Sequence, residues 1–156
     1  NRAVALEAST DALMGSEAYM AKSAEGRDWI VPGSSVDDEL LELVAGAPDP
    51  EANPLYVSSV RAACAGGQMV KGIGMGAEIA TRADAATGAS TLFMRNVTGA
   101  YSGVAWFTGS ADAAAMQAQQ AALAADAGFA QLVDSAAGVF IDDVDPAQSV
   151  LWRRLS

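Results

Sequence analysis

Five polar or aromatic residues that can hold a ligand lie on or beside predicted strands in the second half of the chain. Guanidinium and amide groups hydrogen-bond to ligand oxygens, while tyrosine and tryptophan combine an aromatic face with one polar atom. We predict a buried polar site built from these five residues: Arg61, Arg95, Asn96, Tyr101 and Trp106. A structural interpretation stays open beside it, with Trp106 in the core, Arg95 paired to a carboxylate and Asn96 opening a turn.

The absence of one residue type limits the chemistry. The chain has no histidine, which excludes zinc or haem held by histidine and any serine–histidine or cysteine–histidine nucleophile pair. The single cysteine, Cys64, cannot form an internal disulfide, and we expect it to be a small buried apolar side chain. The catalytic residues of any enzyme activity are therefore unknown, and we predict neither a cofactor nor a metal.

Two further motifs resemble ligand sites, but their spacing argues against that function. Clustered carboxylates at 142–145 and 37–39 could bind calcium, yet they lack the glycine and the distal glutamate of an EF-hand loop. The glycine-rich segment 66–76 follows a strand and opens a helix, where phosphate can bind, but neither phosphate-loop motif is present. We interpret the first as solvated loops and the second as close packing of the backbone.

Charge and hydropathy exclude two classes of partner. With 9 basic and 19 acidic residues the net charge is −10, so the chain repels phosphate and lacks the basic surface of a nucleic-acid-binding protein. Although 51% of residues are hydrophobic, no uninterrupted apolar run is long enough to span a membrane. The lone cysteine is compatible with a reducing compartment, and we predict a cytoplasmic location.

Periodicity and turn residues predict an α+β fold for the second part of the chain. Gly88 is expected to end one helix, and Ser110 is expected to cap the next. The expected strands and helices alternate in the following order: strand Leu55–Cys64, helix Gln68–Thr87, strands Thr91–Thr98 and Tyr101–Thr108, helices Ala111–Ala125 and Phe129–Ala137, and strand Gln148–Leu155.

Fewer helices and strands are predicted for the first part of the chain than for the second. Helices are expected over Asn1–Ala12 and Glu17–Asp28, with Ser16 as the cap of the second. Trp29–Val31 reads as a short extended segment. Asp38–Val44 is ambiguous between strand and helix, and we favour a strand.

The two ends of the chain match each other in pattern. Without a gap, three apolar segments align: Tyr19–Ala21 on Phe129–Gln131, Trp29–Val31 on Val139–Ile141, and Leu40–Leu41 on Val150–Leu151. The repeat predicts three regions, namely a partial first copy at 1–44, a linker at 45–54 and a complete unit at 55–156. It also predicts that the start of the first copy precedes Asn1 in the native protein. A separate helical arm at 1–44 is the alternative.

The order of the segments SGVAWFTG, DAGFAQL and SVLWRRL resembles the dimeric α+β barrel superfamily of ferredoxin-like proteins. The resemblance covers about Leu55–Leu155 and, by repetition, Asn1–Val44, and it implies a β-α-β-β-α-β unit. Its four-stranded antiparallel sheet would carry helices on one face. The other face would pack on a second sheet to form a barrel, from another subunit or a tandem copy. The superfamily includes cofactor-independent oxygenases, in which Arg95 would hold a phenolate and Asn96 or Trp106 would contact the reacting oxygen.

Three functions follow as hypotheses. The first is a homo-oligomeric α+β barrel protein that binds a small apolar or aromatic ligand or serves as an assembly unit. The second is a cofactor-independent monooxygenase of the antibiotic-biosynthesis type. The third is a purely structural assembly subunit. The predicted partners are a second copy of the chain and a small ligand, with no nucleic acid and no membrane.

Overall fold

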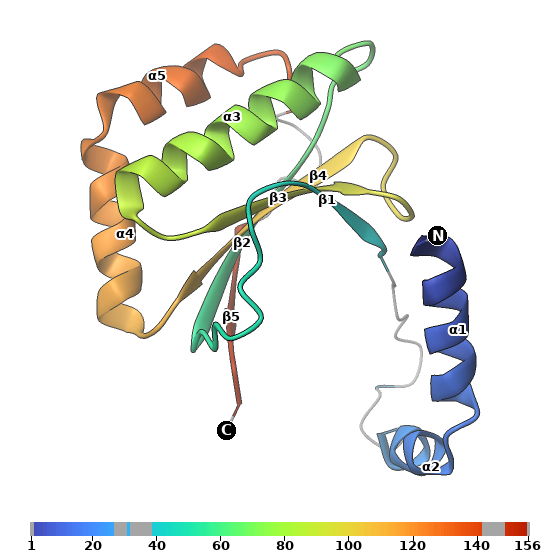
Figure 1. Cartoon of the computed structure of the whole chain (residues 1–156). Helices are drawn as coiled ribbons and strands as arrows, with labels where there is room; N and C mark the ends of the chain where they lie inside the picture. The colour runs from blue at the N-terminus through green and yellow to red at the C-terminus, as the bar shows by residue number, and fades with distance from the viewer. Residues whose placement is uncertain (1, 27–30, 32–38, 142–148, 156) are drawn as a thin grey trace. The chain divides into compact units, whose positions relative to one another are not determined.

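The computed structural model describes residues 2–26, 31, 39–141 and 149–155 (Figure 1). The chain forms two compact units, residues 1–37 and residues 38–156. Two sequence-based expectations lie outside the described residues: the extended segment 29–31 apart from Val31, and the acidic loop 142–145. The acidic cluster at 37–39 is described only at Glu39.

The described part of the first unit contains two helices, α1 (Arg2–Met14) and α2 (Glu17–Gly26). Both helices were predicted from the sequence. Ser16 is the predicted cap of α2, and its hydroxyl oxygen accepts a hydrogen bond of 3.3 Å from the backbone N–H of Tyr19. This bond satisfies one of the backbone donors that the first turn of a helix leaves free.

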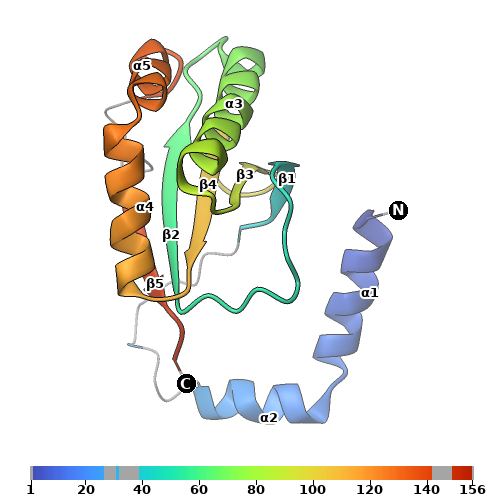
Figure 2. The same ribbon diagram turned by 60° about the vertical axis from the view of Figure 1, so that its left-hand side comes forward.

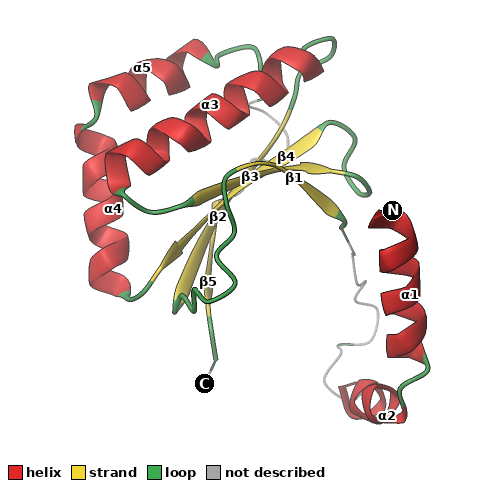
Figure 3. Ribbon diagram, in the orientation of Figure 1, coloured by secondary structure: helices red, strands yellow, loops and turns green. Residues whose placement is uncertain are grey.

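The second unit is an α+β structure with a mostly predicted order of elements (Figure 3). Strand β1 confirms the strand favoured for Asp38–Val44, and it precedes the expected succession of strand, helix, two strands, two helices and strand. The elements are β1 (Leu41–Ala45), β2 (Tyr56–Ala63), α3 (Met69–Thr87), β3 (Thr91–Asn96), β4 (Gly103–Ser110), α4 (Ala113–Ala125), α5 (Ala127–Ser135) and β5 (Ser149–Arg153).

The described residues form one sheet of five antiparallel strands in the order β1-β3-β4-β2-β5, so the expected count of four is wrong. The additional strand is β1, which pairs with β3 in a register that sets Leu41 opposite Asn96. Without β1, strand β3 would be an edge with unpaired backbone groups. The described part of the sheet is open, since β1 and β5 are its two outer strands, and it does not itself close into the expected barrel.

Helices α3, α4 and α5 gather on one face of this sheet (Figure 2). Two glycines allow α3 to approach closely. A Cβ atom added at Gly72 would overlap Sγ of Cys64, and one added at Gly76 would overlap the ring of Phe93. The expected close backbone packing is therefore confirmed at these two positions. Gly74 differs, because a Cβ there would meet no atom within 4 Å.

The core between α3 and the sheet is built around aromatic rings. Phe93 is fully buried, and its ring centroid lies 5.0 Å from that of Trp106. Phe140 meets Trp106 edge to face with centroids 5.5 Å apart. The indole N–H of Trp106 donates a 2.9 Å hydrogen bond to the backbone oxygen of Gly76, so the same residue fastens the sheet to α3.

Polar side chains hold α4 and α5 in place. The cap of α4 is Asp112, whose carboxylate accepts from Ala115 N–H at 2.7 Å, so the prediction of Ser110 as the cap is wrong. Strand β4 extends through Ser110, whose backbone is therefore part of the sheet, and its hydroxyl donates to Gln119 of α4. Asp126 caps α5 and accepts two hydrogen bonds, of 2.7 and 2.8 Å, from Nη2 of Arg82 on α3.

No helix among the described residues of this unit lies on the opposite face of the sheet (Figure 2). Residues opposite each other in an antiparallel pair share a face. The registers therefore place one apolar set on the uncovered side, which we call the open face: Leu41, Leu43, Val57, Leu92, Met94, Ala105, Phe107, Val150 and Trp152. Strands β3 and β4 thus carry apolar side chains on both faces of the sheet.

Candidate functional site

A cleft of about 640 Å³ lies between the sheet and the helices of the second unit. Strands β2, β3 and β4 form its floor, and α3, α4 and α5 contribute its wall. Most of the lining is apolar and includes three aromatic rings: Trp106, Phe129 and Phe140. Clefts of roughly 300–1,000 Å³ with such a lining are typical of small-molecule sites.

The backbone of the second unit explains why these rings meet. The β4–β2 register sets Trp106 opposite Val60 on the floor of the cleft. Asp126 caps α5 by accepting from the N–H of Phe129 at 2.6 Å, which holds that residue in the first turn of the helix. Beyond α5, Ala65 N–H bonds to Val139 O, and Ile141 N–H bonds to Ala63 O. These two bonds keep Phe140 against the end of β2.

Three hydroxyl side chains cross the floor of the cleft on neighbouring strands. Ser58 of β2 lies opposite Thr108 of β4, which lies opposite Thr91 of β3. The hydroxyl oxygens of Thr91 and Thr108 are 3.0 Å apart, and the Ser58 hydroxyl donates to the backbone oxygen of Thr108 at 3.3 Å. We call this set the hydroxyl row.

Two lining residues carry charge. Asp134 belongs to α5 and is exposed. Arg61 belongs to β2, but its guanidinium is paired with the carboxylate of Glu39. Successive residues of a strand point to opposite faces, so Arg61 alternates with the cleft residues Val60 and Ala62. The guanidinium of Arg61 is thus neutralised by Glu39 on the face of the sheet opposite the cleft floor.

Of the five residues predicted for the site, two line the cleft, Trp106 and Arg61. Trp106 is 9% exposed and also belongs to the core. The other three lie elsewhere. The Arg95 Nε donates to Glu42 at 2.7 Å, Asn96 donates to Glu39 at 3.2 Å, and Tyr101 is 93% exposed in the β3–β4 turn. The structure therefore does not bring the five together.

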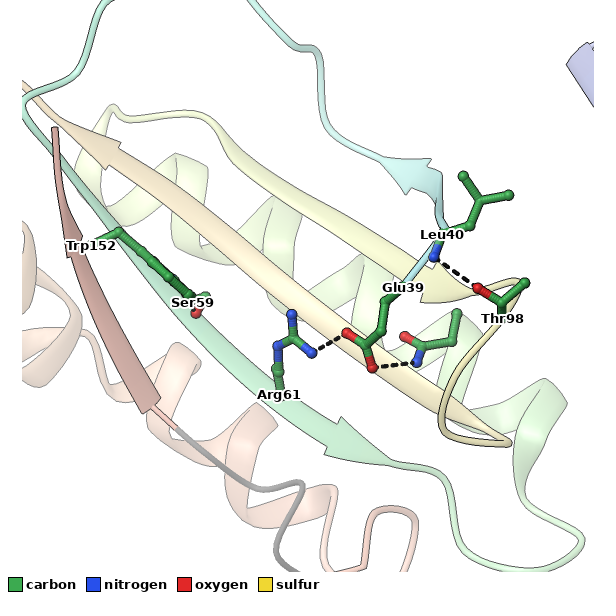
Figure 4. Close-up of polar contacts among 7 residues, drawn as sticks. Glu39, Leu40, Ser59, Arg61, Thr98 and Trp152 are labelled. Carbon is green, nitrogen blue, oxygen red and sulfur yellow. Dashed lines mark hydrogen bonds and ion pairs between the residues drawn. The ribbon is translucent and has the colours of Figure 1, made fainter. Parts of the chain in front are cut away.

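A second polar cluster forms on the open face (Figure 4). Glu39 accepts hydrogen bonds from both Arg61 and Asn96, which unites two of the predicted residues around a carboxylate. The Leu40 N–H donates to the Thr98 hydroxyl at 2.9 Å and fixes the chain before β1. Further along β2, the indole of Trp152 donates to the hydroxyl of Ser59 at 3.1 Å. These bonds attach the outer strands to the middle of the sheet.

Sequence reasoning missed most of the cleft. The sequence predicts Phe129 only as the first residue of a helix and Phe140 only as part of an apolar segment. It predicts the residues of the hydroxyl row only as members of strands. One signal was available, because Ser58 lies within one predicted strand, while Thr91 and Thr108 lie at the ends of two others. The three residues become neighbours only through the order and register of the strands, which the sequence does not specify locally.

No metal site is visible in the part of the chain that the structure describes, since no group of three potential ligands among its cysteine, aspartate and glutamate residues converges there. Cys64 is a free thiol, only 2% exposed, at the end of β2. Its burial raises the pKa of the thiol above the ordinary value, which disfavours the nucleophilic thiolate. Cys64 therefore acts as an apolar core residue, as predicted.

Comparison with known proteins adds no family assignment. No protein-family model matches the chain, and no curated protein sequence is significantly similar to it. Among the described residues, no helix is long and apolar enough to cross a membrane.

Proposed function

We propose that this protein binds a small apolar or aromatic ligand in the cleft between its sheet and helices. The observation that carries the proposal is the cleft itself, about 640 Å³ in volume and lined by Trp106, Phe129 and Phe140. Burial of ligand surface against such rings supplies most of the free energy of binding in apolar pockets. The side chain of Val60 on the cleft floor is half-exposed and therefore accessible to a ligand.

Binding is better supported than oxygenase chemistry. The oxygenase hypothesis places Arg95 at a phenolate and Asn96 or Trp106 at the reacting oxygen. Trp106 lines the cleft, but Arg95 and Asn96 do not. Their polar atoms are engaged by Glu42 and Glu39. The lining offers apolar contact and hydroxyl groups, which are the interactions of a binding site.

The cleft is tested with diphenylhexatriene, a hydrocarbon that fluoresces when it leaves water for an apolar site. The native chain should take it up saturably with a stoichiometry of one. Val60→Phe fills the floor of the cleft and should reduce the affinity at least about tenfold. Val97→Phe is the matched control, because Val97 is 55% exposed and lies outside the cleft lining. Absence of saturable uptake, or equal loss in both variants, would contradict the proposal.

A second candidate function, assembly with another copy of the chain, rests on the open face. This face is largely apolar, and Trp152 is 53% exposed there. Exposed apolar surface of this kind marks interaction sites. The sheet order β5-β2-β4-β3 is also the order of a ferredoxin-like unit, which supports the proposed pairing of two sheets into a barrel. We therefore propose homo-oligomerisation through the open face.

A further inference from the structure

We infer that the cleft selects a neutral ligand with an apolar body and one oxygen-bearing end, a hydroxyl or a carbonyl, that docks on the hydroxyl row. This inference rests on the proposed ligand-binding function and adds to it the chemical class of the ligand. It follows from three observations on the cleft: the unused hydrogen-bonding capacity of its floor, the apolar surface beside it, and the distribution of charge around it.

The hydroxyl row has hydrogen-bonding capacity to spare. Thr91 and Thr108 share one hydrogen bond of 3.0 Å, in which one hydroxyl donates and the other accepts. The hydrogen of the accepting hydroxyl has no acceptor among the described residues. Ser58 donates to a backbone oxygen, so its own oxygen can still accept. The floor thus presents both a donor and an acceptor to a ligand.

The neighbouring row of the sheet is apolar. One step along the strands from the hydroxyl row, Val60, Trp106 and Phe93 lie side by side on β2, β4 and β3. Of these, Val60 and Trp106 line the cleft, and Phe129 and Ile79 face the same space from the helices. A ligand that places its polar end on the hydroxyl row therefore lays its body against apolar side chains.

Charge around the cleft disfavours an anion. The guanidinium of Arg61 is already paired with Glu39, and the remaining charged lining residue is the carboxylate of Asp134. The whole chain carries a net charge of −10. An anionic head group would lose its hydration without gaining a cationic partner, whereas a neutral hydroxyl or carbonyl loses little and regains its hydrogen bonds.

Competition between two ligands of equal chain length tests the inference. Octan-1-ol and octanoate are each titrated against the native chain loaded with diphenylhexatriene, at pH 7. Octan-1-ol should displace the reporter at a concentration at least about tenfold lower than octanoate, because a carboxylate is costly to desolvate. Equal displacement, stronger displacement by octanoate, or no displacement by octan-1-ol would overturn the inference.

A double substitution tests the hydroxyl row itself. Thr91→Val with Thr108→Val removes both partners of one hydrogen bond, which is better tolerated than removing one. Octan-1-ol should then bind roughly three- to tenfold more weakly, while diphenylhexatriene, which has no polar atom, keeps its affinity. The control is Thr81→Val on α3, whose hydroxyl donates within the helix at 3.0 Å. Unchanged octan-1-ol affinity in the double variant would refute the role of the hydroxyl row.

The two proposals fail in different ways. If diphenylhexatriene does not enter the native chain, the cleft is not a ligand site and the proposed function fails with the inference. If the hydrocarbon binds but octan-1-ol and octanoate are not distinguished, the cleft remains a ligand site and only the assignment of a neutral, oxygen-bearing ligand is wrong.

Discussion

Gly76 sits at the point where helix, sheet and cleft meet. Its missing side chain leaves room for the ring of Phe93, and its carbonyl oxygen accepts the indole N–H of Trp106 at 2.9 Å. Trp106 in turn forms part of the cleft floor. The absence of a side chain at Gly76 therefore allows α3 to pack closely on the strands that form the floor of the cleft.

Substitution of alanine for glycine should change the free energy of unfolding in opposite directions at two positions of α3. Gly76→Ala forces a methyl group into the Phe93 ring and should lower the free energy of unfolding by about 1–3 kcal/mol. Gly74→Ala meets open space and should raise it by about 0.5–1 kcal/mol, because alanine is the better helix former. Urea unfolding followed by circular dichroism measures both. Equal effects would show that α3 does not pack on the sheet through Gly76.

Helix α5 depends on one carboxylate at its first turn. Asp126 caps the helix and accepts from Nε and Nη2 of Arg82, which joins α5 to α3. The hydrogen bond from Arg82, followed by the one from Phe129 N–H, lowers the pKa of Asp126 below the ordinary value for aspartate. Because α5 supplies Phe129 and Val133 to the cleft, this ion pair positions one wall of the site.

The pH dependence of stability follows from the sign of that shift. A carboxyl group with a lowered folded pKa stabilises the fold above its unfolded pKa of about 3.9, and the stabilisation is lost as the pH falls through the folded value. Asp126→Asn keeps a capping oxygen but loses the charge. It should melt at a lower temperature than the native chain at pH 7, and the difference should close as the pH falls below about 4.

Thermal melts between pH 2.5 and 7 make this comparison. Asp134→Asn on the same helix is the control, since no hydrogen bond or ion pair of the Asp134 carboxylate is seen among the described residues. It should melt like the native chain at every pH. A difference between Asp126→Asn and the native chain that stayed constant down to pH 2.5 would contradict the assigned role of the ion pair.

At the scale of the whole molecule, the second unit has two different faces. One face is covered by α3, α4 and α5 and contains the cleft (Figure 1). The other is the open face, which carries both the apolar set and the polar cluster of Glu39, Arg61 and Asn96. Ligand binding and assembly can therefore be separated by substitution, since they would use opposite sides of one sheet.

Assembly through the open face predicts a dimer in solution. One chain has a mass of 15.8 kDa. Light scattering after size-exclusion chromatography should give twice this mass. Trp152→Asp places a charge on the open face and should shift the protein to the mass of a single chain. Val70→Asp, at an 89% exposed position on α3, should leave the dimer intact. A native chain that elutes as a monomer would exclude this assembly.

Local pattern was sufficient for most elements of this chain. The helix that ends at Gly88, the paired strands around the 97–102 turn and the break at Asp126 were all predicted, because periodicity and capping act over a few residues. The cap of α4 was misplaced by two residues, since Ser110 and Asp112 are both good caps and only the extent of β4 chooses between them. The repeat, the resemblance and the oligomer stay predictions.

What the sequence by itself determined is the α+β class, the succession of elements and the exclusion of histidine chemistry. Only the tertiary structure decided which residues form a site. Arg95 and Asn96 are adjacent in sequence, but strand alternation sends them to opposite faces. Ser58, Thr91 and Thr108 are far apart in sequence, but the strand order and register set them in one row. Non-local backbone pairing brings the site together, and residue spacing does not encode that pairing.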